Sequence, residues 1–120
     1  MKILADVAVG FVAFLHVAFF VLESFFWTRP LGRRVFGLDV ELANASRALA
    51  ANQGLYNSFL AAGLVWGLLE GSAGYAIKMF FLSCVVIAGI VGAATAKRSI
   101  LFVQALPAAV AMALVIYVRP

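Results

Sequence analysis

A chain of 120 residues that is 66% hydrophobic and only 12% charged does not suit an ordinary soluble domain, because a domain of this size must present a largely polar surface to water. The net charge of +4 does not require nucleic acid, since arginines beside anionic lipid headgroups explain it. One cysteine and one histidine exclude an intramolecular disulfide and a zinc site of ordinary spacing. We therefore expect a single integral membrane domain over residues 1–120, with neither metal nor cofactor.

The first predicted element is the apolar stretch 3–27, which is long enough to cross a hydrocarbon core of about 30 Å. After the connection that follows it, Asp39 is expected to cap a long second helix, because its carboxylate can accept from the free amides of the first turn. The residues after Asp39, "VELANASRA", are too polar for contact with lipid. We expect them at the membrane interface, with the second span over 49–69.

The third and fourth predicted spans cover 75–96 and 99–118, with Lys97 and Arg98 in the hairpin between them. Pro107 is expected to kink the last span, because proline lacks the amide that bonds one turn back. The predicted fold class is therefore an all-α membrane protein, a four-transmembrane-helix bundle with a short interfacial segment between helices 1 and 2.

Small residues recur at spacings that let helices approach closely, and we expect them to serve contacts within the chain more often than contacts between copies. They are Gly63 with Gly67, Gly89 with Ala93, and Ala105 with Ala109 and Ala113.

Basic residues predict the orientation. Most of them fall in or near the first and third connections, and positive residues in short loops stay cytoplasmic. The protein is therefore expected to be a multi-pass protein of the inner membrane with both termini extracytoplasmic. We expect Lys78 and Glu70 to be solvated charges at helix ends, and Trp27 to belong to an interfacial aromatic belt.

Polar residues inside the predicted spans are the candidate functional groups, because an ionisable side chain is costly in hydrocarbon. His16 and Glu23 are seven residues apart and share one helix face. With a rise of about 1.5 Å per residue, residues of the second and fourth spans reach similar depths. The resulting candidate set for ligand or proton binding, a layer in the cytoplasmic half of the bundle, is Glu23, His16, Asn52, Gln53, Tyr56, Asn57 and Gln104.

Each of these residues also has a structural interpretation. Glu23 could reach the interface or pair with Arg47, and a neutral His16 could bond to Asn57 or Tyr56. The amides could serve as interhelical hydrogen bonds. No catalytic or metal-binding residue is assigned.

Two segments, "FFWTRPLGRRVFGLD" and "LAANQGLYNSFLAAGLVWGL", resemble a family of short bacterial membrane proteins catalogued as domain of unknown function number thirteen hundred and four. The resemblance implies a four-helix membrane protein and supplies no activity. Its motif residues here are Glu23, Trp27, Phe36, Gly37, Asn52, Gln53, Gly54, Tyr56 and Asn57.

Three functions fit this pattern, and the sequence does not decide whether the protein is an enzyme. The favoured one is binding or transport of a small molecule or proton, for which a homodimer would supply a larger pathway. The others are an accessory membrane subunit and an enzyme that uses Glu23 and His16 as acid and base on a lipid-like substrate. Expected partners are membrane lipids, a small-molecule ligand and a second copy, and not nucleic acid.

Overall fold

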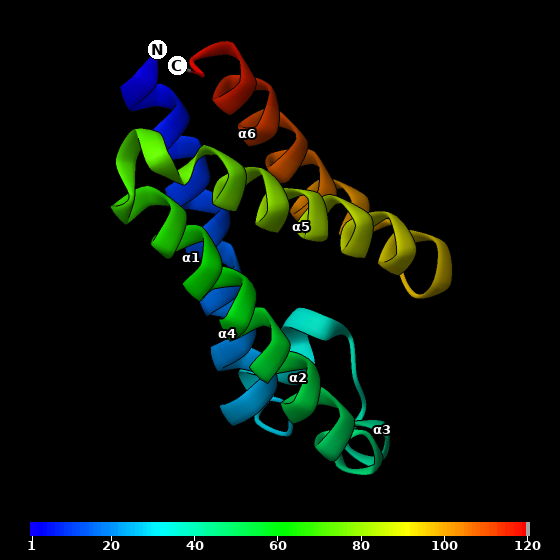
Figure 1. The fold of residues 1–120 in the computed structure, drawn as a ribbon. Helices are drawn as coiled ribbons and strands as arrows, with labels where there is room; N and C mark the ends of the chain where they lie inside the picture. Colours follow the sequence, from blue (N-terminus) through cyan, green and yellow to red (C-terminus); the bar gives the residue numbers. More distant parts are fainter. Residues whose placement is uncertain (120) are drawn as a thin grey trace. The chain divides into compact units, whose positions relative to one another are not determined.

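The computed structural model describes residues 1–119, and over this range its regular secondary structure is entirely helical (Figure 1). The prediction of an all-α protein is confirmed. The elements are α1 (Lys2–Phe25), α2 (Pro30–Phe36), α3 (Val40–Ala45), α4 (Arg47–Leu69), the 3-10 turn η1 (Gly71–Gly74), α5 (Tyr75–Thr95), the π-helical turn η2 (Leu101–Ala105) and α6 (Leu106–Tyr117).

The long helices lie at the positions of the predicted spans. Two helical stretches, Lys2–Phe25 and Gly71–Thr95, are long and apolar enough to cross a membrane, and Leu101–Tyr117 is a shorter apolar helix. They indicate association with a membrane. α4 has the length of a span, but its first half carries the amides of the "AANQGLYNS" segment and lowers its hydropathy.

The connection between α1 and α4 consists of two short helices. α2 ends at Gly37, whose φ of +66° is a left-handed conformation that suits glycine. The Asp39 side chain then accepts a hydrogen bond of 2.7 Å from the backbone N–H of Leu42, so the predicted cap is confirmed. The helix it caps is short, however. Ser46 lies between α3 and α4, and its hydroxyl donates to the Leu42 carbonyl at 2.7 Å.

Pro107 interrupts the last apolar stretch, as predicted. The N–H of Leu106 donates to the carbonyl of Leu101, five residues earlier, and the turn widens into η2 immediately before the proline. A proline ring clashes with the carbonyl one turn back, and a wider turn is one way a helix accommodates it.

The chain divides into two compact units, each described here by itself. The central unit is His16–Phe59, and the terminal unit comprises Met1–Leu15 and the described residues from Leu60 onward. In the terminal unit, α5 packs along η2 and α6, and the beginning of α1 lies close to the end of α6 (Figure 1). Its core consists of small and branched apolar residues, namely Ala5, Val9, Val12, Ala13, Leu64, Leu82, Val85, Ala108, Ala111 and Val115.

Glycines make the close contacts of the terminal unit. A Cβ at Gly89 would lie 2.6 Å from the backbone nitrogen of Ala105, so α5 meets the backbone of η2 there. Gly63 instead leaves room for a side chain, because a Cβ there would meet the ring of Phe81. These glycines serve contacts within the chain. In the last apolar stretch, Ala109 and Ala113 are exposed, and Ala105, Ala108 and Ala111 are the buried set, so of the predicted alanines only Ala105 serves a contact within the chain.

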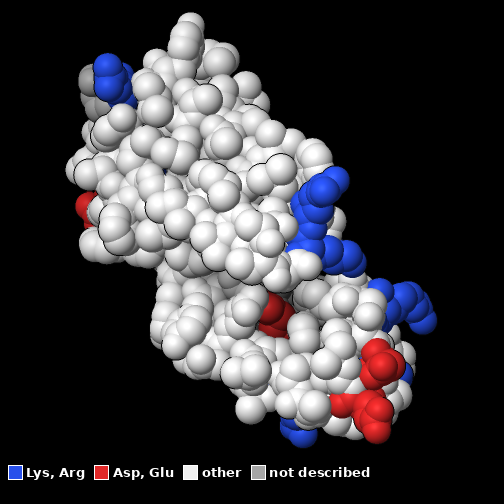
Figure 2. Space-filling view, turned by 90° about the vertical axis from the view of Figure 1, so that its right-hand side faces the viewer, with Lys and Arg blue, Asp and Glu red and all other residues white. Residues whose placement is uncertain are grey.

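The surface carries many large apolar side chains, among them Ile3 and Leu69, whose side chains are about four-fifths exposed at 80% and 81%. Figure 2 shows one face of the molecule, on which uncharged surface is broad and charged side chains gather in a few small clusters. Exposed apolar area of this extent is unusual for a soluble monomer.

Candidate functional site

The buried face of α1 contains the two candidate ionisable residues. Val9, Val12 and His16 are fully buried, and Glu23 is only 5% exposed. These residues follow the helical repeat and form the face predicted from the spacing of His16 and Glu23. The buried face of α1 is thus apolar near the N-terminus of the helix, at Val9 and Val12, and polar toward its C-terminus, at His16 and Glu23.

In the central unit, α4 presents a narrow buried face to the Glu23 end of this face of α1. Ala50, Gly54 and Asn57 are buried and recur at helical spacing. A Cβ at Gly54 would lie 2.6 Å from the Ser24 hydroxyl, 3.1 Å from the Glu23 Cβ and 3.2 Å from the Phe20 carbonyl oxygen. The absence of a side chain at Gly54 therefore allows α4 to approach α1 one turn before Asn57.

Glu23 and Asn57 form the candidate site. The Asn57 Nδ2 group donates a hydrogen bond of 2.5 Å to Glu23 Oε1, and both side chains are buried. The alternative partner, Arg47, lies exposed in the first turn of α4. An amide donor can orient a carboxyl, but it carries no charge with which to neutralise a carboxylate.

His16 begins the central unit and is fully buried. Its ring meets that of Phe19 edge to face, with the ring centroids 5.4 Å apart. His16 and Glu23 are separated by two turns of α1, about 10 Å along the axis. The histidine therefore belongs to the same face as Glu23, at a different level.

Three other candidates on α4 lie away from the Glu23–Asn57 pair. Asn52, Gln53 and Tyr56 are exposed in the structure. The Asn52 amide donates to the Tyr56 hydroxyl at 3.4 Å, and the ring of Tyr56 packs against Phe59. The buried face of α4 is narrow, and of the four clustered polar residues Asn57 is the one that is buried and hydrogen-bonded to α1.

Gln104 lies in η2, in the terminal unit, and is partly buried. Its membership of a layer with Glu23 stays a prediction. Within residues 1–119 there is no group of three or more histidine, cysteine, aspartate or glutamate side chains placed to hold a metal ion. The candidate site thus consists of one carboxyl, that of Glu23, and one neutral amide, that of Asn57.

Two residues that shape this unit make contacts that the sequence interpretation did not predict: Gly54, to which it gave no structural role, and Trp27, which it assigned to an interfacial aromatic belt. Gly54 permits the helix approach, and its position one turn before Asn57 is the signal that could have identified it. Trp27 is partly buried; its Nε1 donates to the Ser46 hydroxyl at 3.0 Å and its ring packs on Phe36 at 4.9 Å. The indole thus connects the end of α1 to α2 and to the residue between α3 and α4.

The family model described as protein of unknown function (DUF1304) matches residues 10–116. The chain belongs to the DUF1304 family. The match includes Glu23, Gly54 and Asn57, and it confirms the resemblance carried by the two segments around them. The comparisons with curated proteins and with solved structures give no match.

Proposed function

We propose that this member of the DUF1304 family is a four-span membrane protein that binds a proton, or a small cation in its place, at Glu23. The observation that carries the proposal is the buried Glu23 carboxyl, whose hydrogen-bond donor is the neutral amide of Asn57. The proposal includes transport of the bound species. It assigns no enzymatic activity.

The membrane part of the proposal is supported by the two long apolar helices and by the exposed apolar side chains. In this arrangement α4 and the shorter helix Leu101–Tyr117 complete the four spans. Both termini would then lie on the extracytoplasmic side of the inner membrane, opposite the basic connections.

Burying a charged carboxylate has a free-energy cost, and this cost is the reason to propose a proton or a cation as the species that binds Glu23. A carboxylate loses favourable hydration when it is buried, and an amide hydrogen bond restores only part of that loss. Protonation removes the charge, and a bound cation balances it. A carboxyl in this setting therefore exchanges one neutralising partner for another, as ionisable groups on ion and proton pathways do.

The experiment uses dicyclohexylcarbodiimide, an apolar reagent that modifies protonated carboxyls in apolar surroundings. The full chain is purified in detergent as wild type, Glu23→Gln and Glu41→Gln, and the adduct mass is followed at several pH values. Glu41 is exposed in the first turn of α3, so Glu41→Gln makes the same chemical change outside the site. We expect labelling of the wild type and of Glu41→Gln that declines as pH rises, and none of Glu23→Gln.

Competition then identifies what replaces the proton. Sodium, potassium and tetraphenylphosphonium are added separately, and a cation that binds at Glu23 slows labelling of the wild type. Equal labelling of wild type and Glu23→Gln would contradict the proposal. If neither is labelled and Glu23→Gln only lowers thermal stability, the accessory function is favoured, in which the hydrogen bond merely fixes the register of α1 against α4.

A further inference from the structure

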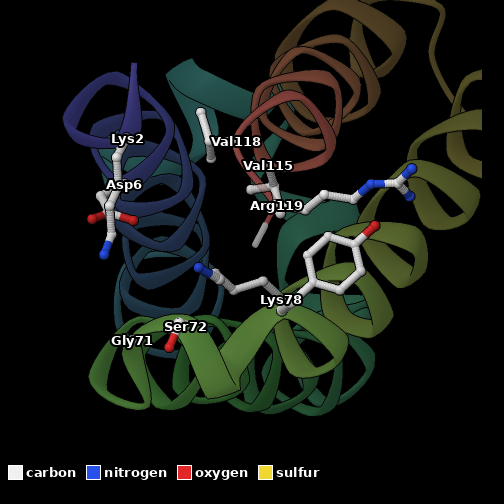
Figure 3. A pocket seen from close by; sticks show the side chains of 9 residues that line it. Lys2, Asp6, Gly71, Ser72, Lys78, Val115, Val118 and Arg119 are labelled. Carbon is white, nitrogen blue, oxygen red and sulfur yellow. The ribbon is translucent and has the colours of Figure 1, made fainter.

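A second candidate site lies in the terminal unit and uses no residue of the Glu23–Asn57 pair. It is a cavity of about 110 Å³ at the end of the unit where the chain begins and ends (Figure 3). Its polar lining comes from α1, η1, α5 and the residue beyond α6, and consists of Lys2, Asp6, Ser72, Tyr75, Lys78 and Arg119.

Cationic side chains dominate this lining. Lys2, Lys78 and Arg119 come from three different elements, whereas Asp6 is the one carboxylate among the cavity residues. Asp6 follows Lys2 by one helical turn, so it balances that lysine first. The lining therefore carries a net positive charge, although its cations do not meet at one point: Figure 3 shows the Lys78 amine directed toward α1 and the Arg119 guanidinium directed to the opposite side. An anion in the cavity would offset this net charge. The cavity is therefore suited to an anionic group.

Lys78 is expected from the sequence to be a solvated charge at a helix end, but its side chain is partly buried and packs against a neighbouring helix. A Cβ at Gly67 of α4 would lie 2.6 Å from the Lys78 Cγ, so the aliphatic part of the lysine fills the space beside this glycine. Figure 3 shows the amine extending from α5 toward α1, on the side where Lys2 and Asp6 lie. The side chain is partly buried and its charged end is directed into the cavity.

Size and lining together indicate the class of ligand. The cavity volume of about 110 Å³ is smaller than the roughly 300–1,000 Å³ of pockets for drug-sized ligands, so the cavity suits a small group rather than a whole drug-sized solute. The hydroxyls of Ser72 and Tyr75 can donate to phosphate oxygens, and lysine and arginine are the usual cationic partners of phosphate. Val115 and Val118 supply an apolar wall.

We propose that this cavity binds a phosphate group, and that the phosphate is carried by the headgroup of an anionic phospholipid. The apolar wall and the location at the ends of apolar helices favour a lipid over free phosphate, because the acyl chains of a lipid add buried apolar contacts that free phosphate lacks. The two sources share the same recognition chemistry and differ in whether acyl chains add to binding.

The test measures binding of three probes to the detergent-purified full chain by native mass spectrometry: dioctanoyl phosphatidylglycerol, dioctanoyl phosphatidylcholine and inorganic phosphate. The variant is Lys78→Gln with Arg119→Gln. The matched control is Lys97→Gln with Arg98→Gln, which removes the same charge from exposed residues after α5. We expect phosphatidylglycerol to bind the wild type and the control equally and the variant about tenfold more weakly.

The other probes separate the two sources. Displacement of phosphatidylglycerol by excess phosphate supports recognition of the phosphate group. Phosphate binding as tight as lipid binding, weakened equally in the variant, would establish the shared chemistry and overturn the assignment to a lipid. Equal binding of phosphatidylglycerol by the variant and the control would overturn the proposal, and so would equal binding of phosphatidylcholine and phosphatidylglycerol by the wild type.

Two further variants keep the test decisive if the double variant does not fold. Lys78→Arg with Arg119→Lys retains both charges, and we expect it to bind phosphatidylglycerol within about threefold of the wild type. Lys2→Gln changes an exposed residue at the beginning of α1 and should weaken binding about threefold. Unchanged binding by Lys2→Gln would overturn the role of the cationic lining.

Discussion

The side-chain amide of Asn57 donates a 2.5 Å hydrogen bond to the carboxyl of Glu23, joining α4 to α1 across 34 positions in the chain. The neighbouring amide of Asn52 instead bonds within its own helix, to Tyr56. This difference distinguishes a residue that acts on the buried carboxyl from one that does not. The difference can be measured as the energetic coupling of Glu23 with each asparagine.

A double-mutant cycle should detect coupling between Glu23 and Asn57 and not between Glu23 and Asn52. Replacing each residue by leucine, singly and together, should give a coupling energy of about 0.6–1.7 kcal/mol for the first pair, the range between the average and the largest values found for polar contacts between membrane helices. The second pair should give less than about 0.3 kcal/mol. Unfolding in mixed detergent measures both cycles. Equal coupling in the two pairs would contradict the assigned contact.

Gly54→Ala should destabilise the protein by about 1–3 kcal/mol, because the added methyl group meets Glu23 and Phe20 of α1. Ser24 can rotate its hydroxyl away, but the Glu23 Cβ and the Phe20 carbonyl move only with the helix. The control is Gly10→Ala, since a Cβ at Gly10 meets nothing within 4 Å. That substitution should stabilise α1 by about 0.5–1 kcal/mol. Thermal unfolding of both variants checks the opposite signs.

Trp27→Phe should lower the free energy of unfolding by about 0.5–1.5 kcal/mol through loss of the bond to the Ser46 hydroxyl. Ser46→Ala removes the same bond from the other side. The losses in unfolding free energy of the two single variants should therefore sum to more than the loss of the double variant. Limited proteolysis between α1 and α4 should also become faster in each variant. Additive losses with unchanged proteolysis would show that the indole does not hold this connection.

Asp39→Ala should cost about 0.5–2 kcal/mol, because the Leu42 amide loses its capping acceptor. Asp39→Asn should retain most of the stability, since asparagine caps as well as aspartate. The comparison separates capping from charge. Chemical unfolding of the two variants is the measurement, and equal losses would indicate that the carboxylate charge matters instead of the cap.

The helices and the buried face of α1 could be predicted from the sequence, because apolar runs of membrane length and the helical spacing of His16 and Glu23 leave few alternatives. The rotation of α4 about its axis could not be predicted. Asn52, Gln53, Tyr56 and Asn57 occupy several faces, and their depths along the helix do not say which face is buried. The small residues Ala50 and Gly54 mark that face, and it includes Asn57 alone of the four.

Two local features also needed the structure. The break at Ser46 separates two helices where the sequence predicted one. Ser46 also accepts a hydrogen bond from Trp27, 19 positions away, and this contact cannot be predicted from the local sequence. Lys78 reads as a solvated charge near a helix end. Its burial depends on Gly67, a residue eleven positions away on α4 that leaves room for the lysine stem.

The contact at Gly54 also fixes the position of Glu23. A Cβ at Gly54 would lie 3.1 Å from the Glu23 Cβ, so the base of the glutamate side chain is held against the backbone of α4. Its carboxyl meets the Asn57 amide about one turn further along the same helix. A carboxyl held at both ends loses little conformational freedom when a proton or a cation binds, so the contact between the two helices preorganises the site.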